Sequence, residues 1–170
     1  RRTVPGYAFS VRRGVEEARG RVLILMDSDF NHAPRYIPRM LEGLREHDVV
    51  SASRFLPGGG MRPVWRAVCS RGFNVFIRLM TGSRMTDNLF GFFALRRTAL
   101  AHCPFDEIFT GFGDYGIRLL FYLQKNGLRI REFPAVYGAR LHGVGNRQLG
   151  PVLCAYVRAT WRLALKGRVR

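Results

Sequence analysis

The chain has 170 residues, of which 47% are hydrophobic, so it can form one domain with an apolar core and is not a disordered tail. Its 28 lysines and arginines against 12 acids give a net charge of +16, which favours anionic partners such as nucleotide phosphates, lipid headgroups or nucleic acid. Only Lys125 and Lys166 are lysines. The planar guanidinium suits bidentate phosphate binding, although coding bias would produce the same excess of arginine.

The cysteines and the lengths of the apolar runs bear on the compartment. Cys69, Cys103 and Cys154 lie far apart and form no C-x-x-C pattern, which argues against a zinc site or a disulfide framework. No apolar run approaches the roughly 18 residues needed to cross a bilayer, and no signal-peptide pattern opens the chain. We therefore expect a cytoplasmic protein, which could still attach to a membrane surface.

The first predicted elements are a helix and a strand. Apolar residues recur at helical spacing from Tyr7 to Arg19, and Gly20 is a suitable residue after the end of a helix. Val22 to Met26 is a short, wholly apolar run and predicts a strand that is buried on both faces. Such a strand belongs inside an α/β sheet.

Two acids follow this strand directly. If the backbone stays extended, Asp27 and Asp29 project on the same side at its carboxyl end, where open α/β sheets bind ligands. Hard oxygen ligands of this kind suit Mg²⁺ or Mn²⁺ carrying a diphosphate, and Asn31 could add a neutral oxygen. The alternative is a solvated turn or a helix N-cap.

The next segments continue the α/β pattern. A helix is expected from Pro34 to Leu44, and Asp48 to Arg54 predicts a second parallel strand. The glycine triplet 58–60 marks either a loop that closes over a ligand or a plain flexible connection.

The second half of the chain begins with an aromatic helix, Val64 to Met80, whose large apolar face could be core or could lie at a bilayer interface. Asp87 to Arg96 then predicts a strand, Asp114 to Asn126 a helix, and Leu128 to Tyr137 an edge strand that passes through a proline.

The last segments are basic. Arg140 to Arg147 is a glycine-bearing loop suited to folding over phosphate oxygens. Val152 to Arg168 predicts a helix that packs on the sheet or lies on a membrane surface. We divide the chain into a domain over residues 1–150 and a C-terminal amphipathic helix over 151–170, which could be membrane-interfacial.

Several short motifs follow one another along nearly the whole chain. They are Ala18-Arg-Gly20, Asp27-Ser-Asp29-Phe-Asn31-His32-Ala-Pro34, Ile37-Pro-Arg-Met-Leu41, Ala52-Ser-Arg54-Phe55, Gly58-Gly-Gly60, Ser70-Arg71-Gly-Phe-Asn74, Asp87-x-x-x-Gly91-Phe92 and Glu132-Phe-Pro134. In this order they resemble the family 2 glycosyltransferases of GT-A fold, and within them the dolichyl- or polyprenyl-phosphate mannose synthase group. The resemblance implies a GT-A-like, Rossmann-like α/β fold whose mostly parallel sheet is flanked by helices.

The resemblance also implies a metal site. Asp27 and Asp29 would hold Mg²⁺ or Mn²⁺ on the diphosphate of a nucleotide-sugar, with Asn31 in the position of a further ligand. The ion would act as a Lewis acid and offset the charge on the departing nucleoside diphosphate, so Asp29 is also a candidate catalytic residue.

Basic side chains would bind the phosphates. By resemblance, Arg54 and Arg71 would neutralise phosphates of the donor or acceptor, and Arg54 is therefore a candidate catalytic residue as well. Arg147 would replace the lysine of the group's phosphate loop, in which His142 also lies. A lipid-phosphate acceptor needs no strong general base, whereas a hydroxyl acceptor does, and Asp114 is then the candidate.

The implied activity is metal-dependent, inverting transfer of a sugar from GDP-mannose or a UDP-sugar to a polyprenyl or dolichyl phosphate. The protein would lie peripherally on an anionic membrane, at the inner face, with no nucleic acid involved. The family's first strand, with its Pro-x-Tyr-Asn-Glu stretch, has no counterpart here, so we expect an N-terminally truncated domain. The alternatives are a non-catalytic basic module that binds anionic membrane or nucleic acid, and an inactive fragment of a glycosyltransferase.

Overall fold

A computed structural model describes residues 6–29, 31–138 and 149–169. Helices and strands alternate along the chain, which confirms the α/β class. The helices are α1 (Tyr7–Glu17), α2 (Ile37–Gly43), α3 (Val64–Thr81), α4 (Phe105–Ile108), α5 (Tyr115–Lys125) and α6 (Leu149–Leu165), with 3₁₀ turns at Pro34–Tyr36 and Arg97–Leu100. The strands are β1 (Val22–Leu25), β2 (Val49–Ser53), β3 (Phe93–Arg96) and β4 (Ile130–Pro134).

The four strands form one mixed sheet in the order β1-β3-β2-β4. Strand β3 pairs antiparallel with both β1 and β2, while β2 and β4 are parallel. Three strands therefore share one direction, and β3, which lies between β1 and β2, runs against them. Only the last four residues of the strand predicted over 87–96 are β-structure, because Asp87 and Asn88 make polar contacts with other segments instead.

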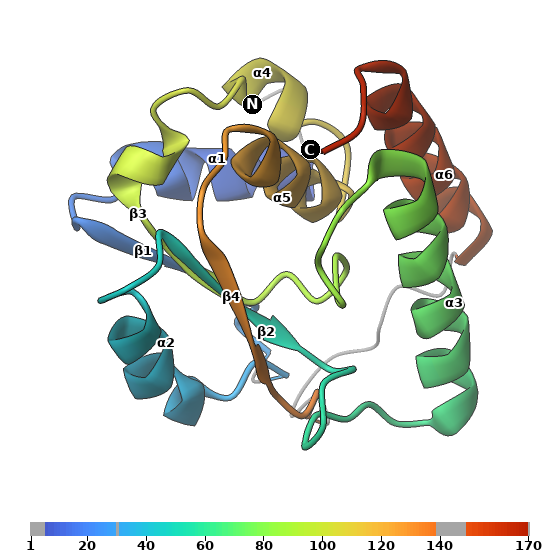
Figure 1. Ribbon diagram of the computed structural model, residues 1–170, viewed down its shortest axis with the longest axis horizontal. Coiled ribbons are helices and arrows are strands. Elements are labelled where there is room, and N and C mark those ends of the chain that lie inside the picture. The colour runs from blue at the N-terminus through green and yellow to red at the C-terminus, as the bar shows by residue number, and fades with distance from the viewer. Residues whose placement is uncertain (1–5, 30, 139–148, 170) are drawn as a thin grey trace.

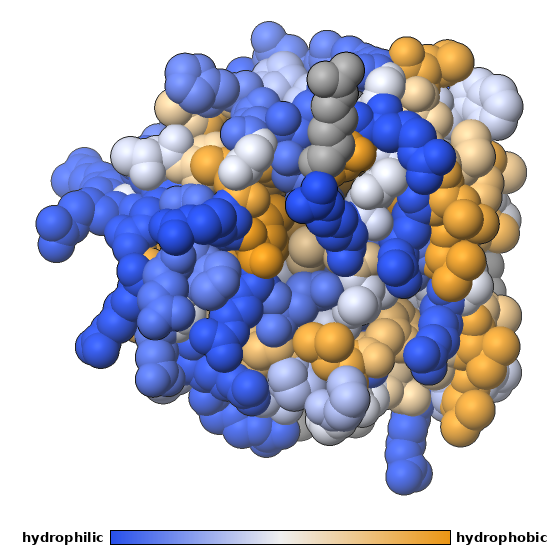
Figure 2. Space-filling view, viewed as in Figure 1, coloured by the Kyte–Doolittle hydropathy of each residue, from blue (hydrophilic) through white to orange (hydrophobic). Residues whose placement is uncertain are grey.

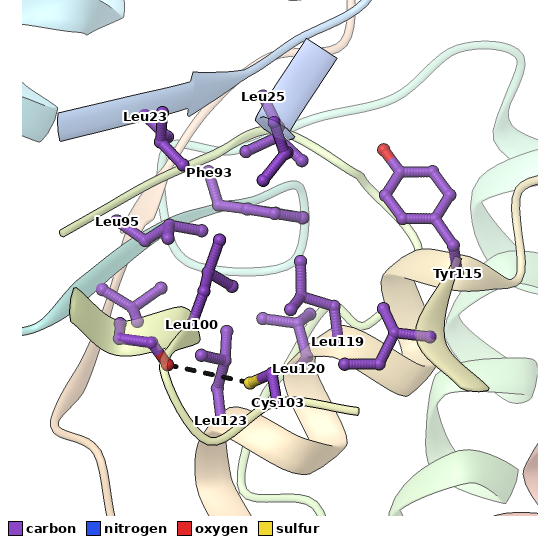
Figure 3. Packing of buried hydrophobic residues seen from close by; sticks show 14 of the residues in the cluster. Leu23, Leu25, Phe93, Leu95, Leu100, Cys103, Tyr115, Leu119, Leu120 and Leu123 are labelled. Carbon is purple, nitrogen blue, oxygen red and sulfur yellow. Dashed lines mark hydrogen bonds between the residues drawn. The ribbon is translucent and has the colours of Figure 1, made fainter. Parts of the chain in front are cut away.

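One face of the sheet carries the largest hydrophobic cluster. In Figure 1, α1, α4 and α5 lie over this face, and Figure 3 shows how the leucines of α5 meet the side chains of β1 and β3. Leu23 and Leu25 of β1 point into this cluster, whereas Val22 and Ile24 pack against the cluster on the opposite face, beneath α2. The period of two explains why an uninterrupted apolar run makes a strand that is covered on both sides.

Helices α3 and α6 lie side by side at one end of the sheet (Figure 1). Ile77 of α3 and Leu163 of α6 are buried together with Phe121 of α5, and the rings of Phe73 and Tyr156 are 6.1 Å apart. The C-terminal helix therefore packs on α3 and α5 through one side and leaves its other side exposed.

The outer sides of α3 and α6 form an exposed apolar surface, which we call the α3/α6 face. Figure 2 shows hydrophobic atoms gathered along the edge of the molecule where these two helices lie. Its large side chains, each at least 41% exposed, are Val64, Trp65, Val68, Val75, Leu79, Leu153, Val157, Trp161 and Leu165. Over the described ranges, neither of these helices nor any other is both long and apolar enough to cross a membrane.

Candidate active site

The candidate site lies where β1, β2 and β4 reach their carboxyl ends. Asp27 follows β1, and the glycine triplet follows β2. A bridge between Gly60 and Val136 ties the triplet to the segment after β4. The hydroxyl of Tyr137, in that same segment, accepts a hydrogen bond from Asn31 over 2.9 Å. Three segments far apart in the sequence therefore meet at one edge of the sheet, as expected for an α/β ligand site.

The two acids are not displayed by an extended backbone, so that prediction was wrong. Strand β1 ends at Leu25, and Ser28 and Asp29 form a turn. The turn returns the chain to His32, a fully buried imidazole close enough to both acids to be influenced by them. Burial lowers the pKa of His32, and the charges of Asp27 and Asp29 oppose that effect.

His32 and Tyr7 hold Asp27. The backbone N–H of Asp27 donates to Nδ1 of His32 over 2.8 Å, and Nε2 of the same ring lies 4.0 Å from Asp27 Oδ2. The hydroxyl of Tyr7 donates to Asp27 Oδ1 over 2.5 Å. His32 stacks on Phe92 with its ring centroid 4.9 Å away, which fixes the plane of the imidazole. Asp27 is therefore held by neutral groups and stays about one-third exposed, at 34%.

Asn31 holds Asp29. Its backbone N–H donates to Asp29 Oδ1 over 3.1 Å and its Nδ2 donates to Asp29 Oδ2 over 2.7 Å. The Asn31 amide is fully buried, and its Oδ1 has no hydrogen-bond partner among the described residues. Burying an amide oxygen without a partner costs free energy, and a bound cation or a hydrogen-bond donor would remove that cost.

These oxygens suit a divalent cation that arrives with a ligand. Within the described ranges no three His, Cys, Asp or Glu side chains are grouped to hold an ion by themselves. Mg²⁺, however, is commonly held by one or two carboxylates together with phosphate oxygens and water. Asp27, Asp29 and the unsatisfied oxygen of Asn31 fit that kind of site.

Arg54 follows β2, and its guanidinium is engaged inside the protein. Its Nε and Nη2 form a bidentate pair with Asp87 over 2.7 and 2.8 Å, with both side chains nearly inaccessible at 6% and 0% exposure. The Arg54 backbone N–H also donates to Asp87 over 3.1 Å. The positive charge of Arg54, which we expected to face phosphates, therefore neutralises the buried Asp87 carboxylate. The sequence analysis did not predict this ion pair.

Other motif residues surround this ion pair. Ser70 Oγ accepts from Arg54 over 3.2 Å, and Asn74 Oδ1 accepts the N–H of Asn88 over 2.6 Å. The Glu132 carboxylate accepts the N–H groups of Thr86 and Asp87 over 2.7 and 3.1 Å. Motif residues from four separate segments thus meet in one network, and the only signal for this in the sequence was that all of them belong to the family pattern.

Arg71 lies at the glycine loop. It lines a pocket of about 490 Å³ together with Arg54 and the glycine triplet, and its guanidinium carbon is 5.9 Å from the centre of the Phe55 ring. The loop is tightly packed at its middle glycine, where a Cβ on Gly59 would come within 2.7 Å of the Ser53 carbonyl oxygen. The triplet is therefore partly explained by close backbone approach, and Arg71 is exposed beside it.

Asp114 lies just before α5, on the loop that follows α4. One carboxylate oxygen accepts the N–H of Phe112 over 2.8 Å, and the other accepts from Arg118 over 2.5 Å. The residue is 5% exposed. The Tyr156 hydroxyl of α6 touches the preceding Gly113 so closely that an added Cβ would lie 2.4 Å from it. Asp114 is thus engaged by neighbours on both oxygens.

Two predicted phosphate ligands lie outside the described residues. They are His142 and Arg147, which belong to the segment 139–148.

The chain matches curated mannosyltransferases. It is 33% identical over 166 residues to the undecaprenyl-phosphate mannosyltransferase of Micrococcus luteus, covering 96% of this chain and 66% of that protein. It is 31% identical over 160 residues to the dolichol-phosphate mannosyltransferase of Saccharomyces cerevisiae, covering 90% of this chain and 58% of that protein. The chain therefore spans only 66% and 58% of the lengths of these relatives.

Solved structures agree on the fold. The glucosyl-3-phosphoglycerate synthase of Mycobacterium tuberculosis, crystallised with Mn²⁺, UDP-glucose and phosphoglyceric acid, superposes with a TM-score of 0.65 at 20% identity, over 95% of this chain and 55% of that one. This similarity supports the predicted GT-A-like fold. The family model described as Glycosyl transferase family 2 matches residues 1–103, more than half of the sequence. The chain belongs to glycosyl transferase family 2.

Proposed function

We propose that this chain carries the metal and diphosphate site of an enzyme that transfers a sugar, with inversion, from a nucleotide-sugar to a polyprenyl or dolichyl phosphate. The observation that carries the proposal is the meeting of Asp27, Asp29 and Asn31 with the glycine loop at one edge of the sheet. The similarity to the two lipid-phosphate mannosyltransferases supports the acceptor class and makes GDP-mannose the first donor to test, before UDP-sugars.

Asp27 and Asp29 would hold Mg²⁺ or Mn²⁺, with Asn31 as a further oxygen ligand. When bound, such an ion would offset the charge that develops on the departing nucleoside diphosphate. Tyr7 and His32 orient Asp27, while the buried amide of Asn31 orients Asp29. These hydrogen bonds would hold both carboxylates in place at the sheet edge.

Arginines would supply the rest of the positive potential. Arg71 is exposed beside the glycine loop and is the clearer phosphate ligand of the two candidates described. Arg54 lines the same pocket, but most of its charge is balanced by Asp87, so its contribution would be to shape and support the pocket wall. By the family resemblance, His142 and Arg147 would add further contacts.

The acceptor would be the nucleophile without help from a strong base. An oxygen of the lipid phosphate would attack the anomeric carbon as the bond from that carbon to the nucleoside diphosphate breaks. A phosphate is already anionic, so no proton has to be removed. This agrees with Asp114, whose two oxygens are taken by Phe112 and Arg118. Asp114 would act as a base only with a hydroxyl acceptor.

The α3/α6 face would bring the chain to its lipid substrate. Its exposed tryptophans, Trp65 and Trp161, are suited to the headgroup region of a bilayer. Arg78, Arg158 and Arg162 are exposed on the same helices, and each arginine near an anionic surface contributes roughly 1 kcal/mol. We therefore propose peripheral binding to anionic membrane, of which the cytoplasmic leaflet is the usual example.

The transfer assay follows labelled sugar from GDP-mannose, and then from UDP-sugars, into a polyprenyl phosphate. Asp29→Asn keeps the size of the side chain and removes its charge, so transfer should fall at least about 100-fold if the acid holds the ion. Asp106→Asn is the matched control, because Asp106 is 91% exposed and lies on α4. Undiminished transfer by Asp29→Asn would contradict the proposal.

Membrane binding is tested by sedimentation with vesicles that contain anionic lipid, at low salt. The double change Trp65→Glu and Trp161→Glu should abolish co-sedimentation, because it places acids on the α3/α6 face. Leu41→Glu is the control, since Leu41 is a comparably exposed apolar residue (45%) on α2. Equal sedimentation of the double variant and the control would remove this part of the proposal.

A further inference from the structure

Tyr7 connects the acid turn to the loop in front of α5. It is the first residue of α1, and its ring lies 5.5 Å from Phe112 and 5.8 Å from Tyr115, centroid to centroid. Its hydroxyl lies next to that of Tyr115 and donates to Asp27 Oδ1. A single side chain thus touches both the Asp27 turn and the loop that carries Asp114.

The ring and the hydroxyl have separable effects. The ring contacts stabilise the packing of α1 against α5, whereas the hydroxyl contributes to no part of the apolar core. Burial raises the pKa of Tyr7, and the hydrogen bond to the Asp27 carboxylate acts in the same direction. In this contact the phenol O–H is the donor and the Asp27 carboxylate oxygen is the acceptor.

The hydrogen bond is directed at one oxygen of Asp27 only. Oδ1 accepts from Tyr7, while Oδ2 lies on the side of the His32 ring, 4.0 Å from Nε2. Holding Oδ1 restricts rotation of the carboxylate about its own axis. A ligand whose orientation is fixed in advance binds an ion more tightly than one that must be ordered on binding.

We propose that Tyr7 is a positioning residue, whose hydroxyl fixes the Asp27 carboxylate so that Oδ2 is presented to the divalent cation. This rests on the proposed function, because it concerns the same ion. It adds a residue outside the Asp-x-Asp motif, from a helix that precedes β1. It also makes the orientation of Asp27 depend on the packing of Phe112 and Tyr115.

The test compares two tyrosine-to-phenylalanine variants. Tyr7→Phe keeps the ring contacts and removes only the hydroxyl. Tyr122→Phe is a matched control, because the Tyr122 hydroxyl, near the C-terminal end of α5, also donates to a carboxylate, that of Glu107. Free Mn²⁺ is measured by electron paramagnetic resonance during titration of each protein, alone and with GDP or UDP, and thermal unfolding of each is recorded beside it.

Tyr7→Phe should weaken Mn²⁺ binding about tenfold, the low end of the usual effect of removing a hydrogen-bond partner from a metal ligand. Tyr122→Phe should bind like the unchanged protein, and the unfolding midpoints of the two variants should stay close. Equal or tighter Mn²⁺ binding by Tyr7→Phe would overturn the positioning role while leaving the proposed function intact. Absence of Mn²⁺ binding by the unchanged protein would overturn both.

Discussion

Two groups of carboxylates in this molecule have opposite surroundings. Asp87 is wholly buried and is paired bidentately with Arg54, so its charge is neutralised within the protein. Asp27 is partly exposed and is held by the neutral Tyr7 and His32, while neutral amide groups of Asn31 hold Asp29. All of these acids belong to motifs, yet only the second group is partly exposed to solvent.

The difference shows that membership of a family motif does not by itself indicate contact with substrate. The Arg54–Asp87 pair joins the end of β2 to the segment before β3, and Asn74 and Glu132 secure that segment from α3 and β4. Its contribution is to build the wall of the site. The acids of the Asp27 turn are instead held by neutral donors and stay partly exposed.

The largest expected effect is on stability and comes from the buried pair. Asp87→Asn leaves the buried guanidinium of Arg54 without its counter-charge, which should lower the free energy of unfolding by about 3–5 kcal/mol. Equilibrium denaturation in urea measures this. Glu17→Gln removes a surface pair with Arg13 and should cost less than about 1 kcal/mol. Similar losses of unfolding free energy in the two variants would contradict the structural role given to the Arg54–Asp87 pair.

A smaller loss is expected at Asn31. Asn31→Ala removes the hydrogen bonds that its side chain donates to Asp29 and Tyr137, at a cost of about 1–2 kcal/mol in stability. It should also weaken Mn²⁺ binding, since Asp29 is no longer oriented and an oxygen ligand is lost. The same denaturation and Mn²⁺ titrations measure both effects. If Asn31→Ala lowers stability but leaves the Mn²⁺ affinity unchanged, Asn31 has a structural role and is not a metal ligand.

The third expectation concerns pH and the buried network. Burial raises the pKa of Glu132 above its ordinary value of 4.5, against the opposing effect of its hydrogen bonds to Thr86 and Asp87. Because the folded-state value is the higher one, the stabilising contribution of this group is complete below about pH 4.5 and is lost as the pH rises through the folded-state value. Glu132→Gln cannot titrate at this position.

The stability of the unchanged protein relative to Glu132→Gln should therefore fall as the pH is raised from about 4 to about 7. Urea denaturation of both proteins at a series of pH values gives this difference directly. A difference that grows with pH would contradict this expectation and would mean that hydrogen bonding to the charged form of Glu132 outweighs its burial.

Much of the fold could be predicted from local pattern. The helix expected over Val64 to Met80 is α3, Val64–Thr81, and the apolar run at Val22 forms β1 as expected. The reversed direction of β3 could not be predicted, because apolar content does not record strand orientation. The extent of β3 was also overestimated, since the polar contacts of Asp87 are made with residues distant in sequence.

The candidate site was predicted in part. The pattern indicated Asp27, Asp29 and Asn31, and the structure brings Asn31 directly onto Asp29. It did not indicate Tyr7, because a tyrosine that begins an amphipathic helix has no distinctive spacing. Nor did it indicate that Asp87 takes up the charge of Arg54, since ion pairing across 33 residues depends on the folded chain.

The central claim is that the acid turn holds a cation together with a nucleoside diphosphate, and thermal unfolding tests it most directly. With Mn²⁺ and GDP or UDP at about 100 times the dissociation constant, bound ligand adds about 2.7 kcal/mol, a rise of about 5–10 °C in the unfolding midpoint. We predict this rise for the unchanged protein and for Asp106→Asn, and its loss in Asp27→Asn and Asp29→Asn. An equal rise in all four proteins would contradict the claim.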